Sequence, residues 1–119
     1  MSFSLKSLLK SRDAMITEFL GVFLIVVTIS FTRIRMDDLF AQGAVTFLVY
    51  SLTTYAAFKF SKAHLNPAVS IGQYSIGNSK LSTLVYYLVS QILASFAAAF
   101  VCQIFNGSGF LVGNEAPWP

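Results

Sequence analysis

Charged side chains are scarce in this sequence: Asp, Glu, Lys and Arg make up 11% of its 119 residues, whereas a soluble domain carries about a quarter. The single cysteine, Cys102, cannot form a disulfide framework, and we expect it to be a small packing residue. The sequence also lacks a Ser/His/acid or Cys/His constellation, a metal-ligand spacing and a phosphate-binding loop. It therefore predicts no enzyme, no cofactor and no metal site, and a net charge of +3 on so apolar a chain does not indicate nucleic-acid binding.

Apolar residues dominate what is present. Hydrophobic residues make up 55% of the chain, and its mean hydropathy is +0.69. Three stretches, 14–32, 40–58 and 81–105, are long enough to cross a bilayer as helices, which takes about 20 residues. Residues 1–13 are polar and basic, and we interpret them as an uncleaved tail, because the following apolar stretch is too long for a signal peptide and lacks a cleavage site. The sequence thus predicts an all-α transmembrane protein.

Basic residues are distributed unevenly between the two sides that these stretches define. Six basic residues lie on the same side as the N-terminus: Lys6, Lys10, Arg12, Lys59, Lys62 and Lys80. Two lie on the opposite side, Arg33 and Arg35. Because Lys and Arg favour cytoplasmic segments, we expect the N-terminus and residues 59–80 to be cytoplasmic. The pattern does not indicate which membrane the protein occupies.

Residues 107–119 lack periodicity and contain Gly, Ser, Asn and Pro, so we expect an extracytoplasmic loop there. Asn106, Gly107 and Ser108 form a glycosylation sequon at its start. The sequon directly follows the third apolar stretch, too near the bilayer for us to expect modification.

A proline lies between the second and third apolar stretches, in the pair Asn66-Pro67. Proline is tolerated in the first turn of a helix, and Asn is a preferred N-cap. A helix is therefore predicted to begin at Pro67 and to end near residues 76–78. Its roughly 12 Å cannot cross a hydrocarbon core of about 30 Å, so we expect residues 60–76 to form a re-entrant loop and half-helix.

The run Lys62-Ala63-His64-Leu65-Asn66-Pro67-Ala68-Val69-Ser70-Ile71-Gly72 closely resembles the first signature loop of the major intrinsic proteins, the aquaporin and glycerol-channel family. The resemblance extends from about residue 15 to residue 105. It implies the first hemi-domain of the aquaporin fold, in residues 14–106: three spanning helices and one re-entrant half-helix. Family members have six spans and two such loops, so the resemblance implies an N-terminal half that needs a second half-domain or another channel chain. It also implies a homotetramer for a full-length chain.

The resemblance assigns the pore to the signature loop. Asn66 uses its side-chain oxygen as a cap, which leaves its NH₂ group to donate to a passing water molecule. The backbone carbonyls of residues 62–65, which include Ala63 and Leu65, offer acceptors. Pro67, Ala68 and Val69 continue the wall along the half-helix. His64 fixes the loop or shapes the vestibule, and a pH gate is the alternative. The implied function is a channel for water and small neutral solutes.

Two polar residues inside the apolar stretches are candidates for supporting this loop. The family has a Glu at the position of Glu18, where it accepts hydrogen bonds from the loop backbone, and a carboxylate can satisfy several buried N–H groups at once. Alternatively, Glu18 reaches the membrane interface. Gln91 is interpreted as a second support that also bonds the backbone near residues 60–66, or else as a helix–helix contact unrelated to the loop.

The second apolar stretch is unusually rich in hydroxyl groups. Thr46, Tyr50 and Thr54 are four residues apart and share one helical face, with Thr53 beside them. We interpret this face as a wet lining, although the hydroxyls could instead bond back to their own helix. By the resemblance, Thr46 replaces an aromatic residue of the outer constriction, which implies a pore wide enough for glycerol or urea. Tyr50 takes a wall position about one turn further in, where its ring would work against this by narrowing the path.

Two other functions stay open from the sequence. One is a non-conducting, truncated membrane subunit that associates with full-length channels. The other is an unrelated membrane protein that carries the motif by chance.

Overall fold

The computed structural model describes residues 5–106 of the chain. These residues form four α-helices, α1 (Leu5–Arg35), α2 (Leu39–Ser61), α3 (Pro67–Ser75) and α4 (Leu81–Asn106), and they contain no strand. The predicted all-α architecture is therefore confirmed. The loop predicted over residues 107–119, with Gly107 and Ser108 of the sequon, lies outside the described residues.

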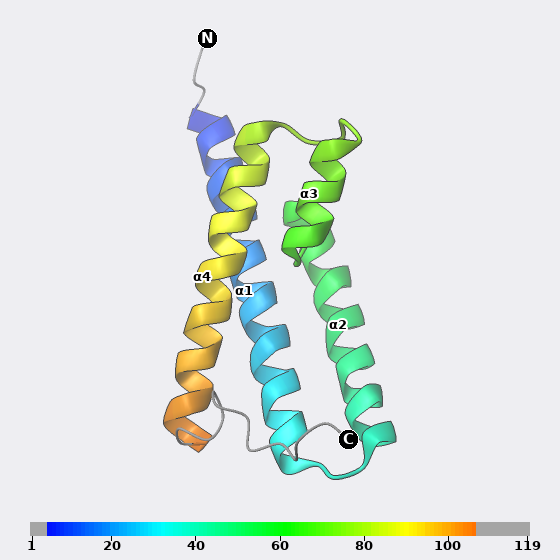
Figure 1. The fold of residues 1–119 in the computed structure, drawn as a ribbon. Coiled ribbons are helices and arrows are strands. Elements are labelled where there is room, and N and C mark those ends of the chain that lie inside the picture. Colours follow the sequence, from blue (N-terminus) through cyan, green and yellow to red (C-terminus); the bar gives the residue numbers. More distant parts are fainter. Residues whose placement is uncertain (1–4, 107–119) are drawn as a thin grey trace.

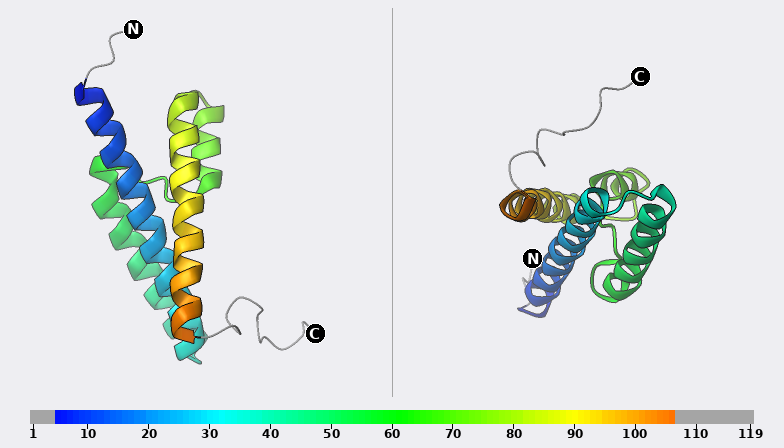
Figure 2. Two further views of the ribbon diagram at one scale, coloured as in Figure 1. Left: turned by 90° about the vertical axis from the view of Figure 1, so that its left-hand side faces the viewer. Right: turned by 90° about the horizontal axis from the view of Figure 1, so that it is seen from below.

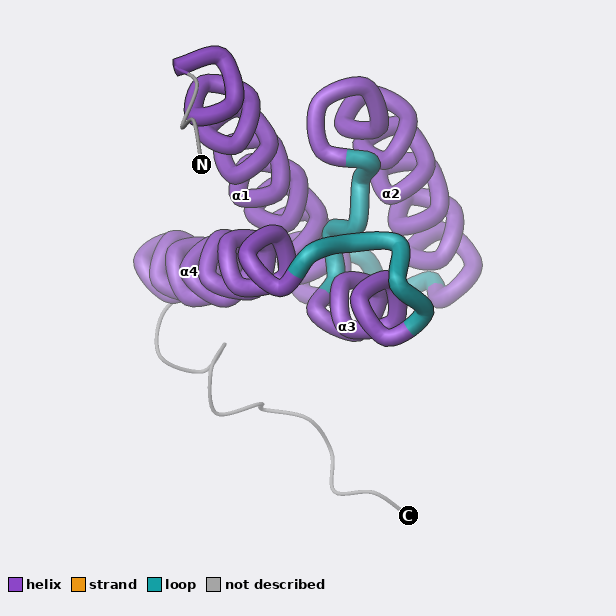
Figure 3. Tube along the Cα trace, turned by 90° about the horizontal axis from the view of Figure 1, so that it is seen from above, coloured by secondary structure: helices purple, strands orange, loops and turns teal. Residues whose placement is uncertain are grey.

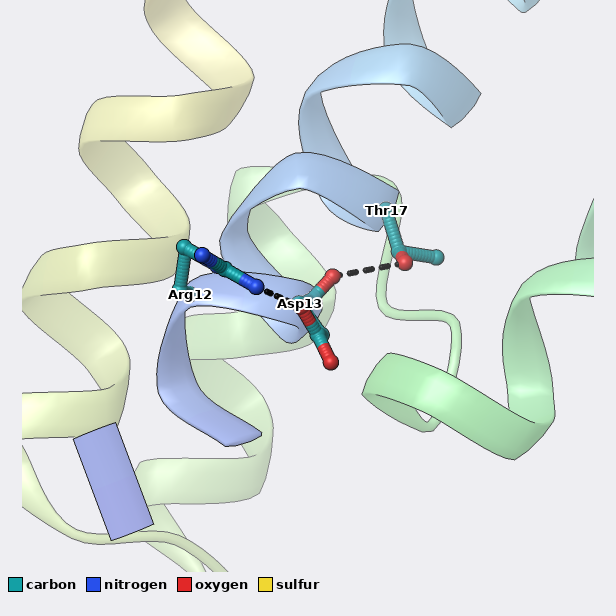
Figure 4. Close-up of polar contacts among 3 residues, drawn as sticks. All are labelled: Arg12, Asp13 and Thr17. Carbon is teal, nitrogen blue, oxygen red and sulfur yellow. Dashed lines mark hydrogen bonds and ion pairs between the residues drawn. The ribbon is translucent and has the colours of Figure 1, made fainter. Parts of the chain in front are cut away.

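The first helix is longer than the apolar stretch that predicted it. α1 begins at Leu5, so most of the predicted tail continues the helix, because residues 5–13 contain neither Gly nor Pro to end it. Near the end of this segment Arg12 pairs with Asp13 at 3.4 Å, and the Thr17 hydroxyl donates to the Asp13 carbonyl at 2.7 Å (Figure 4). Residues 5–13 and the first span are thus one continuous helix.

By length and composition, two helical segments can cross a membrane, Leu9–Arg35 and Leu81–Phe105. α2 has 23 residues, which is long enough, but it does not reach the required apolar composition. Its hydroxyl-bearing residues lower its hydropathy, chiefly Thr46, Tyr50, Ser51, Thr53, Thr54 and Tyr55. Of the three predicted spans, composition therefore supports two.

α3 is a short helix that starts in the middle of the bundle. From the end of α2, residues 62–66 run back into the bundle, and α3 then returns toward the same end (Figure 1). Its nine residues rise about 13 Å, less than half of a hydrocarbon core of about 30 Å. Gly77, with φ of 82°, lies in the turn that follows.

α1 lies between α2 and α4 and packs against both, while α3 packs against the N-terminal half of α4 (Figure 2). Ala94, Ala98 and Cys102 are fully buried on α4, and small residues at this four-residue spacing let two helices approach closely. Cys102 is thus a packing residue, as expected. The core itself is formed by buried Val22, Ile25, Ala57, Leu65 and Ala94.

The face of α2 away from α1 is left open. Within the described range, α2 has close backbone contacts with α1 and none with α3 or α4. Seen along the bundle, the loop 62–66 crosses from α2 toward α3 and α4 (Figure 3). The structure is therefore open on the side between α2 and α3.

Candidate functional site

The loop between α2 and α3 has an irregular backbone that side chains must hold in place. Lys62, Ala63 and Leu65 have φ values of 66°, 51° and 53°, a left-handed conformation that costs non-glycine residues roughly 1–2 kcal/mol each. This backbone directs its N–H groups toward α1, where they need acceptors. Two side chains supply them: the Ser61 hydroxyl accepts from Ala63 N at 3.1 Å, and a carboxylate takes the next two N–H groups.

That carboxylate is Glu18, whose side chain is fully buried. Its Oε1 accepts from the Ser61 hydroxyl at 2.7 Å and from His64 N at 2.9 Å. Its Oε2 accepts from Leu65 N at 2.7 Å and from Gln91 Nε2 at 2.8 Å. Glu18 therefore bonds the loop backbone and does not reach an interface. Four hydrogen bonds replace the hydration that this anion loses on burial.

Gln91 acts on the loop indirectly, which corrects the expectation that it bonds the loop backbone. Its Nε2 donates to Glu18 Oε2 and, at 3.0 Å, to the Ser70 hydroxyl of α3. A side-chain amide supplies two hydrogens, so both are used here. Gln91 reaches a carboxylate and a hydroxyl because α4 passes beside α3, while the loop N–H groups face α1. Its Oε1 is buried without a partner among the described residues.

The contact of Ser70 with Gln91 also orients His64. Since Ser70 Oγ accepts from Gln91, its own hydrogen can be donated to His64 Nδ1, 3.0 Å away. When Ser70 donates in this way, the proton of a neutral His64 ring lies on Nε2. Burial lowers the pKa of His64, and the nearby Glu18 carboxylate acts in the opposite direction. The ring also packs edge-on against Tyr87, with centroids 4.8 Å apart, so Ser70 and Tyr87 together fix the position of the His64 ring.

Asn66 ends the loop and caps α3. Its backbone is extended, and its Oδ1 accepts from Ala68 N at 2.9 Å. Its Nδ2 donates to no protein atom in residues 5–106, and the side chain is exposed. Pro67, Ala68 and Val69 are exposed as well. The capped helix start thus presents a free, exposed amide donor.

The side chains of Ala63 and Leu65 belong to the core. Leu65 is only 5% exposed, and Ala63 packs against the same cluster. Leu65 lies directly over Gly21 of α1, where a Cβ would come within 2.5 Å of Leu65 Cδ2. Any contribution of these two residues to a pore is therefore through their carbonyl groups. Within the described part of the chain, no donor reaches the carbonyl oxygens of residues 63–65.

The hydroxyl-rich face of α2 divides into two parts. Thr53 is buried against Gly21 of α1, so it does not belong to an open face. Tyr50 and Thr54 line an open concavity of about 900 Å³ along α2, and Thr46 lies outside it. The Thr54 Oγ1 itself is buried without a partner among the described residues. Unlike Thr17 and Thr32, the threonines at 46, 53 and 54 make no hydrogen bond back to their own helix in the described structure.

Three supporting residues were not predicted to have a role: Ser61, Ser70 and Tyr87. The Tyr87 hydroxyl donates to the Ser61 carbonyl at 2.6 Å and so joins α4 to the end of α2. Ser61 and Ser70 are both buried. Ser61 directly precedes the signature loop and Ser70 lies within it, and this position is the signal that could have identified them, because a buried hydroxyl needs a partner.

Several known proteins are similar to this chain in sequence. The family model described as Major intrinsic protein matches residues 4–116. The chain is 35% identical over 96 residues to Aquaporin-8 of Milnesium tardigradum, which covers 74% of this chain and 27% of that protein. It is 30% identical over 117 residues to the probable aquaporin TIP-type alpha of Phaseolus vulgaris, with 86% and 46% covered.

A probable glycerol uptake facilitator protein of Thermotoga maritima is 37% identical over 57 residues, which cover 48% of this chain and 24% of that protein. No solved structure matches the chain significantly. The chain spans between about a quarter and about half of the length of these curated relatives.

Proposed function

Because the chain belongs to the major intrinsic protein family, whose members are membrane channels, we propose that it forms one half of a channel for water and small uncharged solutes such as glycerol. In this proposal α1, α2 and α4 cross the bilayer, and residues 62–66 with α3 enter it from one side. The open face of α2 then meets protein or water, which fits its hydroxyl groups better than lipid does.

The observation that carries the proposal is the free amide of Asn66 at the start of α3. The oxygen of this side chain is held by Ala68 N, so the exposed Nδ2 donor keeps a fixed direction. A water molecule or a polyol hydroxyl can accept from it and then donate to the unused carbonyls of residues 63–65. Solutes that exchange hydrogen bonds in this way can pass.

The α3 N-terminus adds an electrostatic barrier to ions. Aligned peptide dipoles place about half a positive charge at the start of a helix. Asn66 lies at this point, partway along the bundle (Figure 1), so cations meet a repulsive field where water meets a donor. The opposing wall must come from a second half-domain or another channel chain, because α2 and α3 line only part of the opening.

The test is an Asn66→Asp substitution. The protein encoded by the entire reading frame that contains these residues is reconstituted in vesicles, with and without the substitution. Asp caps a helix as well as Asn does, so folding should be kept while the donor is lost and a negative charge is added. We expect stopped-flow water flux to fall and cation leak to rise. Asn78→Asp, the same change in the exposed turn after α3, is the control and should leave both unchanged.

Equal flux in the Asn66→Asp and Asn78→Asp proteins would contradict the proposal. If the unmodified protein carries no flux but lowers that of a co-reconstituted full-length channel, it is instead a non-conducting subunit.

Solute size gives a second test, centred on Thr46. We propose that its small side chain widens the outer constriction, so glycerol should enter the same vesicles. Pore diameter and lining donors set selectivity in such channels, and Thr46→Phe should therefore reduce glycerol flux more than water flux. Thr28→Phe, on α1, is a bulk-matched control, and equal ratios of the two fluxes in both variants would refute the assignment.

A further inference from the structure

A cavity of about 320 Å³ lies at the end of the bundle where α1 begins, α2 ends and α4 begins. These helix ends come together at one end of the molecule (Figures 1 and 3). The cavity adjoins the concavity on the open face of α2, with which it shares Lys59, and its lining does not include the start of α3. Its wall carries three lysines and five hydroxyl side chains: Lys10, Lys59, Lys62, Ser11, Ser61, Thr83, Tyr86 and Tyr87.

The charge of this wall is positive and not neutralised. No Asp or Glu side chain lines the cavity. The nearby carboxylates are engaged elsewhere, since Asp13 pairs with Arg12 and Glu18 accepts four hydrogen bonds. Lys10 makes no ion pair among the described residues.

The other two lysines rest on aromatic rings. The Lys59 ammonium lies 5.9 Å from the Phe60 ring centroid, and that of Lys62 lies 5.2 Å from the Phe58 centroid. At exposed sites such contacts are worth only about 0.5–1 kcal/mol. Three lysines thus line one cavity, and none of them has a carboxylate partner in residues 5–106.

Neutral donors complete the site. Thr83 lies in the first turn of α4, where backbone N–H groups and the helix dipole favour an anion. The hydroxyls of Ser11 and Tyr86 add flexible donors. Tyr87 also borders the cavity, but its hydroxyl is already used by the Ser61 carbonyl. Cations, hydroxyls and a helix start together match a tetrahedral oxyanion.

We propose that this cavity binds a terminal phosphate group, either the phosphomonoester head group of phosphatidic acid or free inorganic phosphate. The cavity lies at the end that the basic residues predict to be cytoplasmic, and basic pockets between membrane helices on that side bind anionic head groups. Its volume is at the low end of the range for ligand sites, which suits a small head group. The proposal concerns binding only and does not depend on conduction.

The test measures binding by thermophoresis of the 119-residue chain in neutral detergent. The probes are dioctanoyl phosphatidic acid, dioctanoyl phosphatidylcholine and inorganic phosphate. The cavity variant is Lys10→Gln with Lys59→Gln, and Lys62 stays unchanged because its left-handed backbone could confuse folding with binding. The control is Arg35→Gln with Lys80→Gln, which removes the same charge from residues outside the cavity.

We expect phosphatidic acid to bind more tightly than phosphatidylcholine, and the cavity variant to lose about tenfold or more in affinity. The control pair should change it by less than about twofold. Competition by millimolar phosphate identifies a free-anion site, and its absence identifies the lipid head group. Lys10→Arg with Lys59→Arg should retain binding, which separates charge from folding. Equal losses in the cavity and control variants, or no preference for phosphatidic acid, would overturn the proposal.

Discussion

At the scale of single residues, the carboxylate of Glu18 determines whether the loop can hold its shape. Both of its oxygens accept two hydrogen bonds, and the donors come from α2, the loop and α4. No other acceptor within residues 5–106 reaches His64 N or Leu65 N. The left-handed loop therefore depends on one side chain of α1.

Glu18→Gln should lower the free energy of unfolding by about 2–4 kcal/mol, although its shape is nearly unchanged. The glutamine amide has an NH₂ group in place of one carboxylate oxygen. In either orientation of the amide, this NH₂ group faces the two donors that the replaced oxygen had accepted from. Each buried donor without an acceptor costs about 1–3 kcal/mol. Equilibrium unfolding in mixed micelles measures the loss.

The matched control for this charge removal is Asp13→Asn. Asp13 lies five residues earlier on α1, with its side chain 54% exposed, and exposed ion pairs contribute about 0–1 kcal/mol. Similar stability of the Glu18→Gln protein and the Asp13→Asn protein would show that the loop does not need the carboxylate.

Gly21→Ala should destabilise the protein by about 1–3 kcal/mol through overpacking. The new methyl group would come within 2.5 Å of Leu65 Cδ2 and 3.3 Å of Thr53 Cγ2. In a Leu65→Ala background the same substitution should cost much less, because the closest contact is then absent. A double-mutant cycle on unfolding free energies gives the coupling.

Gly43→Ala is the control, since a Cβ there meets nothing within 4 Å. It should stabilise α2 by up to about 1 kcal/mol through helix propensity. Losses of equal size at positions 21 and 43 would contradict the close approach of the loop to α1.

At the scale of elements, α2 ends at a lysine in a left-handed backbone conformation that is unfavourable for residues other than glycine. Lys62 is the C-cap of α2 with φ of 66°, and its N–H donates to the Phe58 carbonyl. Glycine commonly occupies left-handed positions at helix ends because it lacks a Cβ. The lysine at this unfavourable position also lines the basic cavity.

Lys62→Gly should therefore raise the free energy of unfolding by up to about 1 kcal/mol, because relief of the left-handed strain exceeds the added entropy of the unfolded chain. Ala56→Gly, in the regular part of α2, should lower it by about 1 kcal/mol. Thermal unfolding in detergent compares the two, and a loss of stability at both positions would contradict the strain.

At the scale of the whole molecule, the two connections at opposite ends of the bundle define its orientation. The α1–α2 connection contains Asp37, and the α3–α4 connection contains Asn78, and both residues are exposed. The basic residues predict that Asp37 lies outside and Asn78 in the cytoplasm. α3 would then enter the membrane from the cytoplasmic side.

Labelling with an impermeant maleimide tests this orientation in membrane vesicles of known sidedness. In a Cys102→Ala background, Asp37→Cys should react only from outside and Asn78→Cys only from the cytoplasmic side. Reaction of position 37 from the cytoplasm alone would invert the topology. Reaction of both positions from one side would show that α2 does not cross the bilayer.

Local signals in the sequence account for much of the fold. The apolar stretches predicted the three long helices, and Asn66-Pro67 predicted the start of α3 at its observed residue. An N-cap residue and a proline act within one helical turn, so the start of a helix can be predicted from them without knowing any distant contact. The start of α1 was missed because a polar segment without Gly or Pro gives no stop signal.

The tertiary structure alone decided how the helices turn about their axes and which polar groups meet. Thr53 of α2 is buried against α1 while Tyr50 lines the open concavity, and a helix with hydroxyl groups on several faces does not reveal this rotation. Glu18 meets a hydroxyl 43 residues away and an amide 73 residues away. The sequence determined that a buried carboxylate needs donors, because desolvation makes it costly without them. Only packing of α1 between α2 and α4 determined which donors those are.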